Sequence, residues 1–197
     1  METPENTKGA IRAVRLATAY ALSAALFLVV LPCVVLSLGI ALDHAVGVPR
    51  LPMDAARYML GGAIVLFGLS WMLWTNVALV RIGGGHPQEA FGKELLPATV
   101  HLVKVGLFAR TRNPMAFGQI TVTEGLAIAI GSATGALLVV PAYAVLVMLY
   151  IRHWEEPGLL ARFGAEYEQY RRDVPMLIPI GRRLRATEKP AAGSHPV

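Results

Sequence analysis

Four long apolar stretches dominate the pattern of hydrophobic and polar positions along the chain. They cover residues 16–42, 58–80, 115–130 and 133–151, and Gly131 and Ser132 form the turn between the last two. At about 1.5 Å of rise per residue, each stretch can cross or nearly cross a hydrocarbon core of roughly 30 Å. The third is the shortest and needs its flanking loop or local bilayer thinning to complete the crossing. The pattern predicts an all-α integral membrane protein with four transmembrane helices, the first bent at Pro32.

A different periodicity follows the fourth stretch. Apolar and aromatic side chains recur at spacings of four, four and three residues, which places them on one face of a helix. They are Leu159, Phe163, Tyr167 and Tyr170. We therefore expect a C-terminal amphipathic helix after the last span. It either lies at the level of the lipid headgroups with its basic side chains toward anionic lipid, or closes over a site formed with the preceding loop.

Composition supports a membrane protein and excludes an ordinary soluble domain. Hydrophobic residues make up 55% of the 197 residues, charged residues only 16%, and the mean hydropathy is +0.53. The net charge of +5 would suggest nucleic-acid binding in a soluble protein. Here the basic residues lie at the ends of apolar stretches, so membrane lipids are the expected partner and nucleic acid is not. A single cysteine, Cys33, and five histidines without metal-ligand spacing predict no metal site.

The distribution of lysine and arginine predicts the orientation in the membrane. Sixteen of them lie in the N-terminal tail, the loop at 81–114 and the region after residue 151. The other two, Arg50 and Arg57, lie in the loop between the first two stretches. The positive-inside rule then places both termini and the 81–114 loop in the cytoplasm.

Two segments on that side carry a recognisable motif. Residues 101–118 read HLVKVGLFARTRNPMAFG. The second segment begins with EEPGL at 155–159 and continues with FGAEY at 163–167, Tyr170, and VP at 174–175. Together, over about residues 97–180, they resemble the isoprenylcysteine carboxyl methyltransferase and phospholipid methyltransferase superfamily, and more closely its bacterial-type members. In that superfamily an Arg-His/Asn-Pro motif opens a helical hairpin, and a Glu-Glu pair and a Phe-Gly-x-x-Tyr motif follow it.

The resemblance implies a membrane enzyme that binds S-adenosyl-L-methionine at the cytoplasmic face and methylates a lipid-soluble or small hydrophobic acceptor. It implies a location in the bacterial inner membrane and a single domain over residues 1–185. The residues after Arg185 are polar and rich in alanine and proline, which predicts a disordered tail at 186–197. By position in the motif, the implied cofactor-binding residues are His101, Leu102, Val103, Phe108, Asn113, Pro114, Met115, Ala116 and Glu155. Arg152 and Glu156 are the expected catalytic residues.

The residue types fit this cofactor. Asn113 and Pro114 predict the start of a helix, with proline at the first helical position. The free N–H groups of that first turn can meet the carboxylate of the cofactor. Arg112 can add a charged hydrogen bond to the same carboxylate. Glu155 or Glu156 can accept from the ammonium group or from the ribose.

Four positions depart from the superfamily pattern. Asn113 replaces the common histidine, Phe108 a tyrosine and Ala116 an aromatic residue; Ile151, with Arg152 beside it, stands where eukaryotic carboxyl-methylating members have an arginine that binds their substrate. The changes at Phe108 and Ala116 favour the alternative function, a non-catalytic membrane scaffold or transport-associated protein that retains the fold.

Glu124 is the one charged residue within the third stretch. It lies roughly 16 Å along the predicted helix from Asn113, at about the middle of the bilayer, where a charge is costly unless it is paired, protonated or hydrated. One interpretation is a neutral glutamic acid bonded to a neighbouring helix. The other is a catalytic role, in which Glu124 lines the channel of the acceptor and handles a polar group or proton there.

Overall fold

The computed structural model describes residues 14, 17–18, 21–22, 25–50, 52, 54–84, 89–90, 93–94 and 99–180. The expected disordered tail at 186–197 and most of the first stretch before residue 25 lie outside these residues. The described chain is mostly helical, as the sequence predicted. Besides the loops that join the helices, the described residues include a short antiparallel pair, β1 (Glu89–Ala90) with β2 (Lys93–Glu94), in which Glu89 pairs with Glu94.

The helices follow the apolar stretches closely. In chain order they are η1 (Leu26–Val30), α2 (Leu31–Val46), α3 (Ala55–Arg81), η2 (Gly106–Ala109), α4 (Pro114–Ile130), η3 (Gly135–Val139), α5 (Val140–Tyr150), η4 (Ile151–Glu155) and α6 (Glu156–Asp173). Here η2 is a 3-10 turn, and η1, η3 and η4 are π-helical turns.

Three continuous helical stretches of the described chain are long and apolar enough to span a membrane. They are Leu26–Val46, Ala55–Arg81 and Gly135–Asp173. The sequence predicted four spans, and the remaining one, at residues 115–130, corresponds to α4. This helix has 17 residues and a length of about 26 Å, so it is shorter than a typical crossing. The last of these helical segments, Gly135–Asp173, ends in α6. Helix α6 carries seven charged side chains and is too polar for the hydrocarbon core. Tyr150 and Trp154 precede it, stacked with ring centroids 5.6 Å apart, and aromatic residues of this kind are enriched at membrane–water interfaces.

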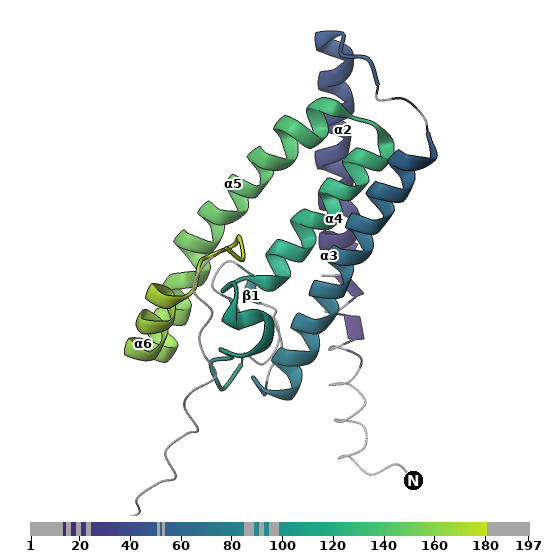
Figure 1. The fold of residues 1–197 in the computed structure, drawn as a ribbon. Helices are drawn as coiled ribbons and strands as arrows, with labels where there is room; N and C mark the ends of the chain where they lie inside the picture. The colour runs from purple at the N-terminus through teal and green to yellow at the C-terminus, as the bar shows by residue number, and fades with distance from the viewer. Residues whose placement is uncertain are drawn as a thin grey trace, which may run out of the picture.

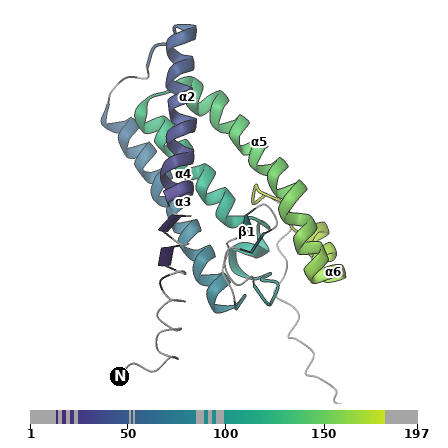
Figure 2. The same cartoon turned by 180° about the vertical axis from the view of Figure 1, so that it is seen from behind.

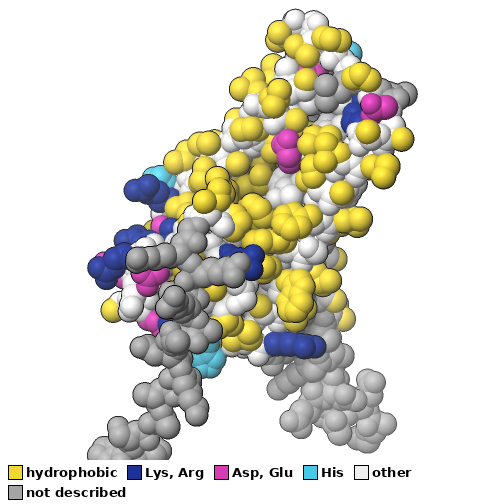
Figure 3. All heavy atoms as spheres, in the orientation of Figure 1, with side chains coloured by type: hydrophobic (Ala, Val, Ile, Leu, Met, Phe, Trp, Pro, Cys, Tyr) yellow, Lys and Arg dark blue, Asp and Glu magenta, His cyan; other side chains and the backbone are white. Residues whose placement is uncertain are grey.

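The three spans and α4 form one bundle. Helices α3 and α4 run antiparallel and side by side, and α2 packs against α4 and against the start of α5 (Figures 1 and 2). Helix α5 then leans away from α4 and leads to α6, which lies beside the loop at 99–113. Apolar side chains cover most of the face of the bundle shown in Figure 3, while basic side chains gather near α6. Surfaces of this kind fit a bilayer around the bundle and its headgroups around α6.

Two pairs of glycines allow α3 and α4 to pack backbone against backbone. A Cβ atom on Gly68 would lie 2.6 Å from the carbonyl oxygen of Gly118, and one on Gly61 would lie 2.6 Å from that of Gly125. The pairs are two helical turns apart on each helix, so they lie along a single seam. Between membrane helices such close packing replaces the hydrophobic driving force that lipid does not supply.

Each π-helical turn comes immediately before an α-helix with a proline in its first turn. The prolines are Pro32, Pro141 and Pro157. A proline lacks the N–H group and its ring crowds the preceding turn, and the wider π turn relieves that crowding. The irregularity that the sequence predicted at Pro32 is therefore a π-helical turn.

A buried polar cluster joins η1, α4 and α5 inside the bundle. Gln119, only 4% exposed, donates through Nε2 to the carbonyl of Phe27 at 3.4 Å, and its Oε1 accepts from the Tyr143 hydroxyl at 2.7 Å. In a π-helical turn the Phe27 carbonyl would accept from the backbone N–H of residue 32, but Pro32 has no N–H group. Gln119 thus supplies a hydrogen bond that the backbone of the first span lacks.

Candidate functional site

The candidate site lies where the start of α4 meets α6. Helix α4 begins with Pro114 at its first position, as the sequence predicted, because proline needs no hydrogen-bond partner there. Asn113 occupies the N-cap position, but its side chain makes no cap hydrogen bond. Its Nδ2 donates instead to the carbonyl of Met176 at 2.9 Å. The expected position of Asn113 is confirmed, and its side chain serves a tertiary contact.

The amphipathic face of α6 packs against the loop before α4. Tyr167 and Tyr170 are buried together with Val174, and Leu102, Leu159 and Phe163 pack around them. The Tyr170 hydroxyl donates to the carbonyl of Phe108 at 2.7 Å. Gly164 takes φ +53° in the middle of α6, a conformation that favours glycine and kinks the helix there. The kinked helix therefore closes over the loop that carries the first motif.

A buried ion pair forms the centre of the site. Nη1 of Arg112 binds Oε1 of Glu156, and the two side chains are 8% and 6% exposed. Arg171 lies 3.9 Å from the other carboxylate oxygen of Glu156 and is 43% exposed. The Nε atom of Arg112 is buried and has no hydrogen-bond partner among the described residues. Burying two charges costs several kcal/mol per ion, which only close pairing offsets.

Tyr167 lies beside this pair and is 1% exposed. Its burial, together with the negative charge of Glu156, raises its pKa to about 12, although Arg112 opposes the shift through its charge and a hydrogen bond. Burial also raises the pKa of Tyr170. Both hydroxyls therefore keep their protons at neutral pH and act as hydrogen-bonding groups rather than as bases.

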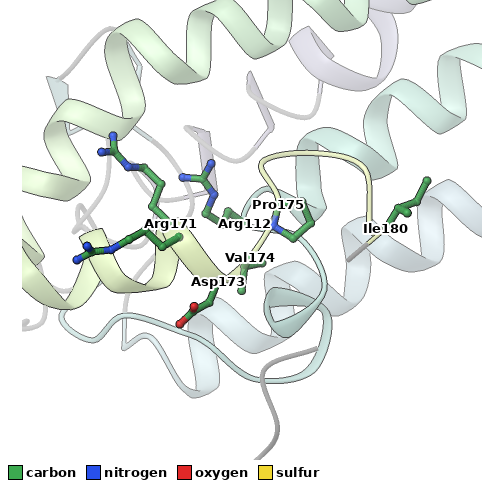
Figure 4. Close-up of a pocket in the computed structure, with 7 residues that line it drawn as sticks. Arg112, Arg171, Asp173, Val174, Pro175 and Ile180 are labelled. Carbon is green, nitrogen blue, oxygen red and sulfur yellow. The ribbon is translucent and has the colours of Figure 1, made fainter. Parts of the chain in front are cut away.

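A pocket with a cavity volume of about 460 Å³ opens next to the ion pair (Figure 4). This volume lies within the range of small-molecule sites. It is lined by Arg112, Arg171, Arg172, Asp173, Val174, Pro175 and Ile180. With Glu156 paired to Arg112 behind the lining, three guanidinium groups stand against two carboxylates. The remaining positive balance suits a carboxylate or a phosphate.

The structure brings part of the expected cofactor residues together. Val103, Phe108 and Pro114 are buried around the start of α4, as is the side chain of Arg112, and Leu102, Asn113, Met115 and Ala116 are half-buried there. His101 is exposed in the same loop. Glu155 is half-buried at the end of η4, one residue before the paired Glu156. Of the two glutamates, Glu156 is the one paired with Arg112.

The other two expected catalytic residues are not part of the ion pair. Arg152 is exposed on η4. Glu124 lies ten residues beyond Pro114, about 15 Å along α4, and is half-buried. Thr121, one turn before it, donates its hydroxyl to the Phe117 carbonyl at 2.8 Å. Within the described chain, Glu124 has neither a hydrogen bond nor an ion pair through its side chain.

Two contributors to the site carry no signal in the sequence. Thr111 is fully buried, and its hydroxyl donates to the Met176 carbonyl at 3.0 Å, 65 residues later. Arg171 reads in the sequence as a solvated residue on the polar face of α6. The role of Thr111 depends on the packing of the segment after α6 onto the 111–113 loop. That of Arg171 depends on the kink at Gly164, which lies between Arg171 and Glu156 in α6. Neither is encoded by a local pattern.

Among the residues that the structure describes, no three histidine, cysteine or acidic side chains gather closely enough to hold a metal ion. The family model described as Phospholipid methyltransferase matches residues 56–166, more than half of the chain. This match runs from the start of α3 through the first half of α6 and includes both members of the ion pair. No curated protein and no solved structure matches the chain significantly.

Proposed function

The chain belongs to the phospholipid methyltransferase family, and from this premise we propose that it transfers a methyl group from S-adenosyl-L-methionine to a lipid-soluble or small hydrophobic acceptor. The observation that carries the proposal is the buried Arg112–Glu156 pair inside the family-matched region. A buried charge pair is costly to build, so its presence beside a pocket favours a role in binding or catalysis.

The residues at the start of α4 and α6 fit the cofactor. Its amino-acid group carries a carboxylate and an ammonium, which match the opposite charges of Arg112 and Glu156. The buried Nε of Arg112, which lacks a partner in the described chain, provides a further donor for the carboxylate after a small rearrangement. The first N–H groups of α4, at Met115 and Ala116, face no intrahelical acceptor and favour an anion.

The remaining expected residues fit around this group. Leu102, Val103 and Phe108 supply apolar surface for the cofactor, and Glu155 is placed to accept from its ammonium or ribose. When bound, the cofactor supplies an electrophilic methyl group on a sulfonium. The chain's own contribution is to orient the two reactants and to exclude water, with Glu156 beside the amino-acid group of the cofactor and Arg152 on the side of the acceptor.

The acceptor is proposed to reach the site from the bilayer. Large apolar side chains of the spans are exposed on the bundle, among them Leu66 at 69% and Leu137 at 81%, which places lipid directly beside the protein. With the basic loop and tail in the cytoplasm, the Arg112–Glu156 pair lies near the cytoplasmic headgroups of a bacterial inner membrane. Glu124, half-buried in α4, is proposed to line the path of the acceptor.

The alternative is a non-catalytic scaffold that retains the fold, which Phe108 and Ala116 favour because they depart from the residues usual in the superfamily. Incubating the purified protein with methyl-labelled cofactor and a total lipid extract separates the two. The proposal predicts label in a lipid-soluble product with the wild type and little with Glu156→Gln. No labelled product from any lipid fraction, although the cofactor binds, would support the scaffold instead.

A further inference from the structure

The segment that follows α6 is fastened to the loop before α4 by backbone and side-chain hydrogen bonds. We call residues 174–178 the C-terminal strap. Its carbonyl at Met176 accepts from Thr111 Oγ1 at 3.0 Å and from Asn113 Nδ2 at 2.9 Å. Its carbonyl at Pro175 accepts from the backbone N–H of Arg112 at 2.9 Å. Three consecutive residues of the loop therefore hold two consecutive carbonyls of the strap.

Thr111 is the member of this arrangement with the most complete set of contacts. It is fully buried, and its hydroxyl both donates to Met176 and accepts from the backbone N–H of Asn113 at 3.3 Å. One side chain thus fixes the strap and the residue just before α4. A valine would fill nearly the same space but would leave the Met176 carbonyl with one donor fewer and the Asn113 N–H with none.

Arg112 lies between the two anchored residues. Its backbone N–H is bound to the strap while its side chain reaches across to Glu156. The strap itself is held from the inside by Val174 and Leu177, which are 2% and 6% exposed. The direction of the Arg112 guanidinium therefore depends on how the 111–113 loop lies against the strap, and hence on the Thr111 hydroxyl.

We infer that Thr111 is a positioning residue for the cofactor site: it ties the loop to the C-terminal strap and so holds Arg112 in its pairing geometry. It acts through Arg112 and touches no reactant. The inference rests on the proposed function for what Arg112 binds. Its structural part, the coupling of Thr111 to Arg112, stands on the hydrogen bonds alone.

The test is a double-mutant cycle read by titration of S-adenosylhomocysteine into the full chain in detergent. Thr111→Val should weaken binding about tenfold, while Thr111→Ser, which keeps the hydroxyl, should stay within about twofold of the wild type. In an Arg112→Ala background, Thr111→Val should cost no further affinity, because its effect passes through Arg112. The matched control is Thr75→Val. Thr75 is also buried, but its hydroxyl donates to Trp71 within its own helix at 2.7 Å, so affinity should not change.

Two results would overturn the inference. Either Thr111→Val binds S-adenosylhomocysteine like the wild type, or Thr111→Val weakens binding as much in the Arg112→Ala background as in the wild-type background. If Thr111→Val does not fold, Thr111→Ala carries the same cycle, since it removes the same hydroxyl without adding a methyl group in its place. If the wild type itself binds no S-adenosylhomocysteine, the proposed function fails separately. The same cycle read in unfolding midpoints then decides the positioning role: non-additive shifts support it, and additive shifts contradict it.

Discussion

Arg112 and Glu156 form a buried ion pair although they lie 44 positions apart in the chain, with a complete helical hairpin between them. The pair joins the start of α4 to the first residue of α6. Removing one partner of a buried pair leaves an uncompensated charge and costs about 3–5 kcal/mol, whereas two apolar residues in its place are often no less stable. The existence of the pair is therefore weak evidence that it serves stability. Because it lies beside a pocket, we interpret it as part of a binding or catalytic site.

The seam between α3 and α4 predicts a clear difference between two neighbouring glycines. Gly61→Ala would bring its Cβ within 2.6 Å of the Gly125 carbonyl oxygen, so the helices must separate and the unfolding midpoint in detergent should fall. Gly62→Ala meets nothing within 4 Å and is the matched control, whose midpoint should stay the same or rise. Equal midpoints for the two variants would contradict the proposed packing.

The polar cluster around Gln119 predicts that replacing this side chain lowers the stability of the bundle and leaves the candidate site in place. Gln119→Leu leaves the Phe27 carbonyl and the Tyr143 hydroxyl without this partner, at a cost of about 1–3 kcal/mol for each group left unsatisfied. Thermal unfolding in detergent should show a lower midpoint. Thr121→Val, which removes only a hydroxyl bonded within α4, is the control and should change the midpoint little. A wild-type midpoint in Gln119→Leu would contradict the role given to Gln119.

Much of the fold could be predicted from the sequence, because hydropathy and proline positions are local signals. The apolar stretches, the start of α4 at Pro114 and the buried face of α6 all follow from them. The kind of irregularity at Pro32 could not be predicted, because a bend and a π-helical turn are alternative responses to the same proline. The pairing of Arg112 with Glu156 rather than Glu155, and the contacts of Thr111, depend on the angle at which α6 meets the loop. Only the packed structure sets that angle.

The orientation in the membrane predicts which introduced cysteines an impermeant thiol reagent can reach. In a Cys33→Ala background, Arg50→Cys should react in intact cells, because it lies in the loop predicted to face outward and is exposed. Arg110→Cys, exposed in the loop beside α6, should react only after permeabilisation. Ser132, on the outward side as well, is 1% exposed and makes a poor labelling position. The reverse pattern of labelling would place the candidate site outside the cytoplasm.

Replacing Glu124 should affect the rate of methyl transfer and the affinity for the cofactor differently. Under the proposed role on the path of the acceptor, Glu124→Gln should reduce methyl transfer at least tenfold while the affinity for S-adenosylhomocysteine stays nearly unchanged. The fold should persist, since the amide has almost the same shape and keeps hydrogen-bonding capacity. Unchanged turnover would retire this role and leave Glu124 as a neutral acid within the bundle.

The measurement that tests the central claim most directly is the affinity of the purified protein for S-adenosylhomocysteine, determined by isothermal titration in detergent. The account predicts saturable binding to the wild type. Arg112→Ala and Glu156→Gln should each weaken it by about 1.5–3 kcal/mol, the range for hydrogen bonds to charged groups, and Glu155→Gln should weaken it if this carboxylate also contacts the cofactor. Arg50→Ala, an exposed arginine far from the site, is the control and should bind like the wild type. Wild-type affinity in both Arg112→Ala and Glu156→Gln, with the fold intact, would contradict a cofactor site built on the buried ion pair.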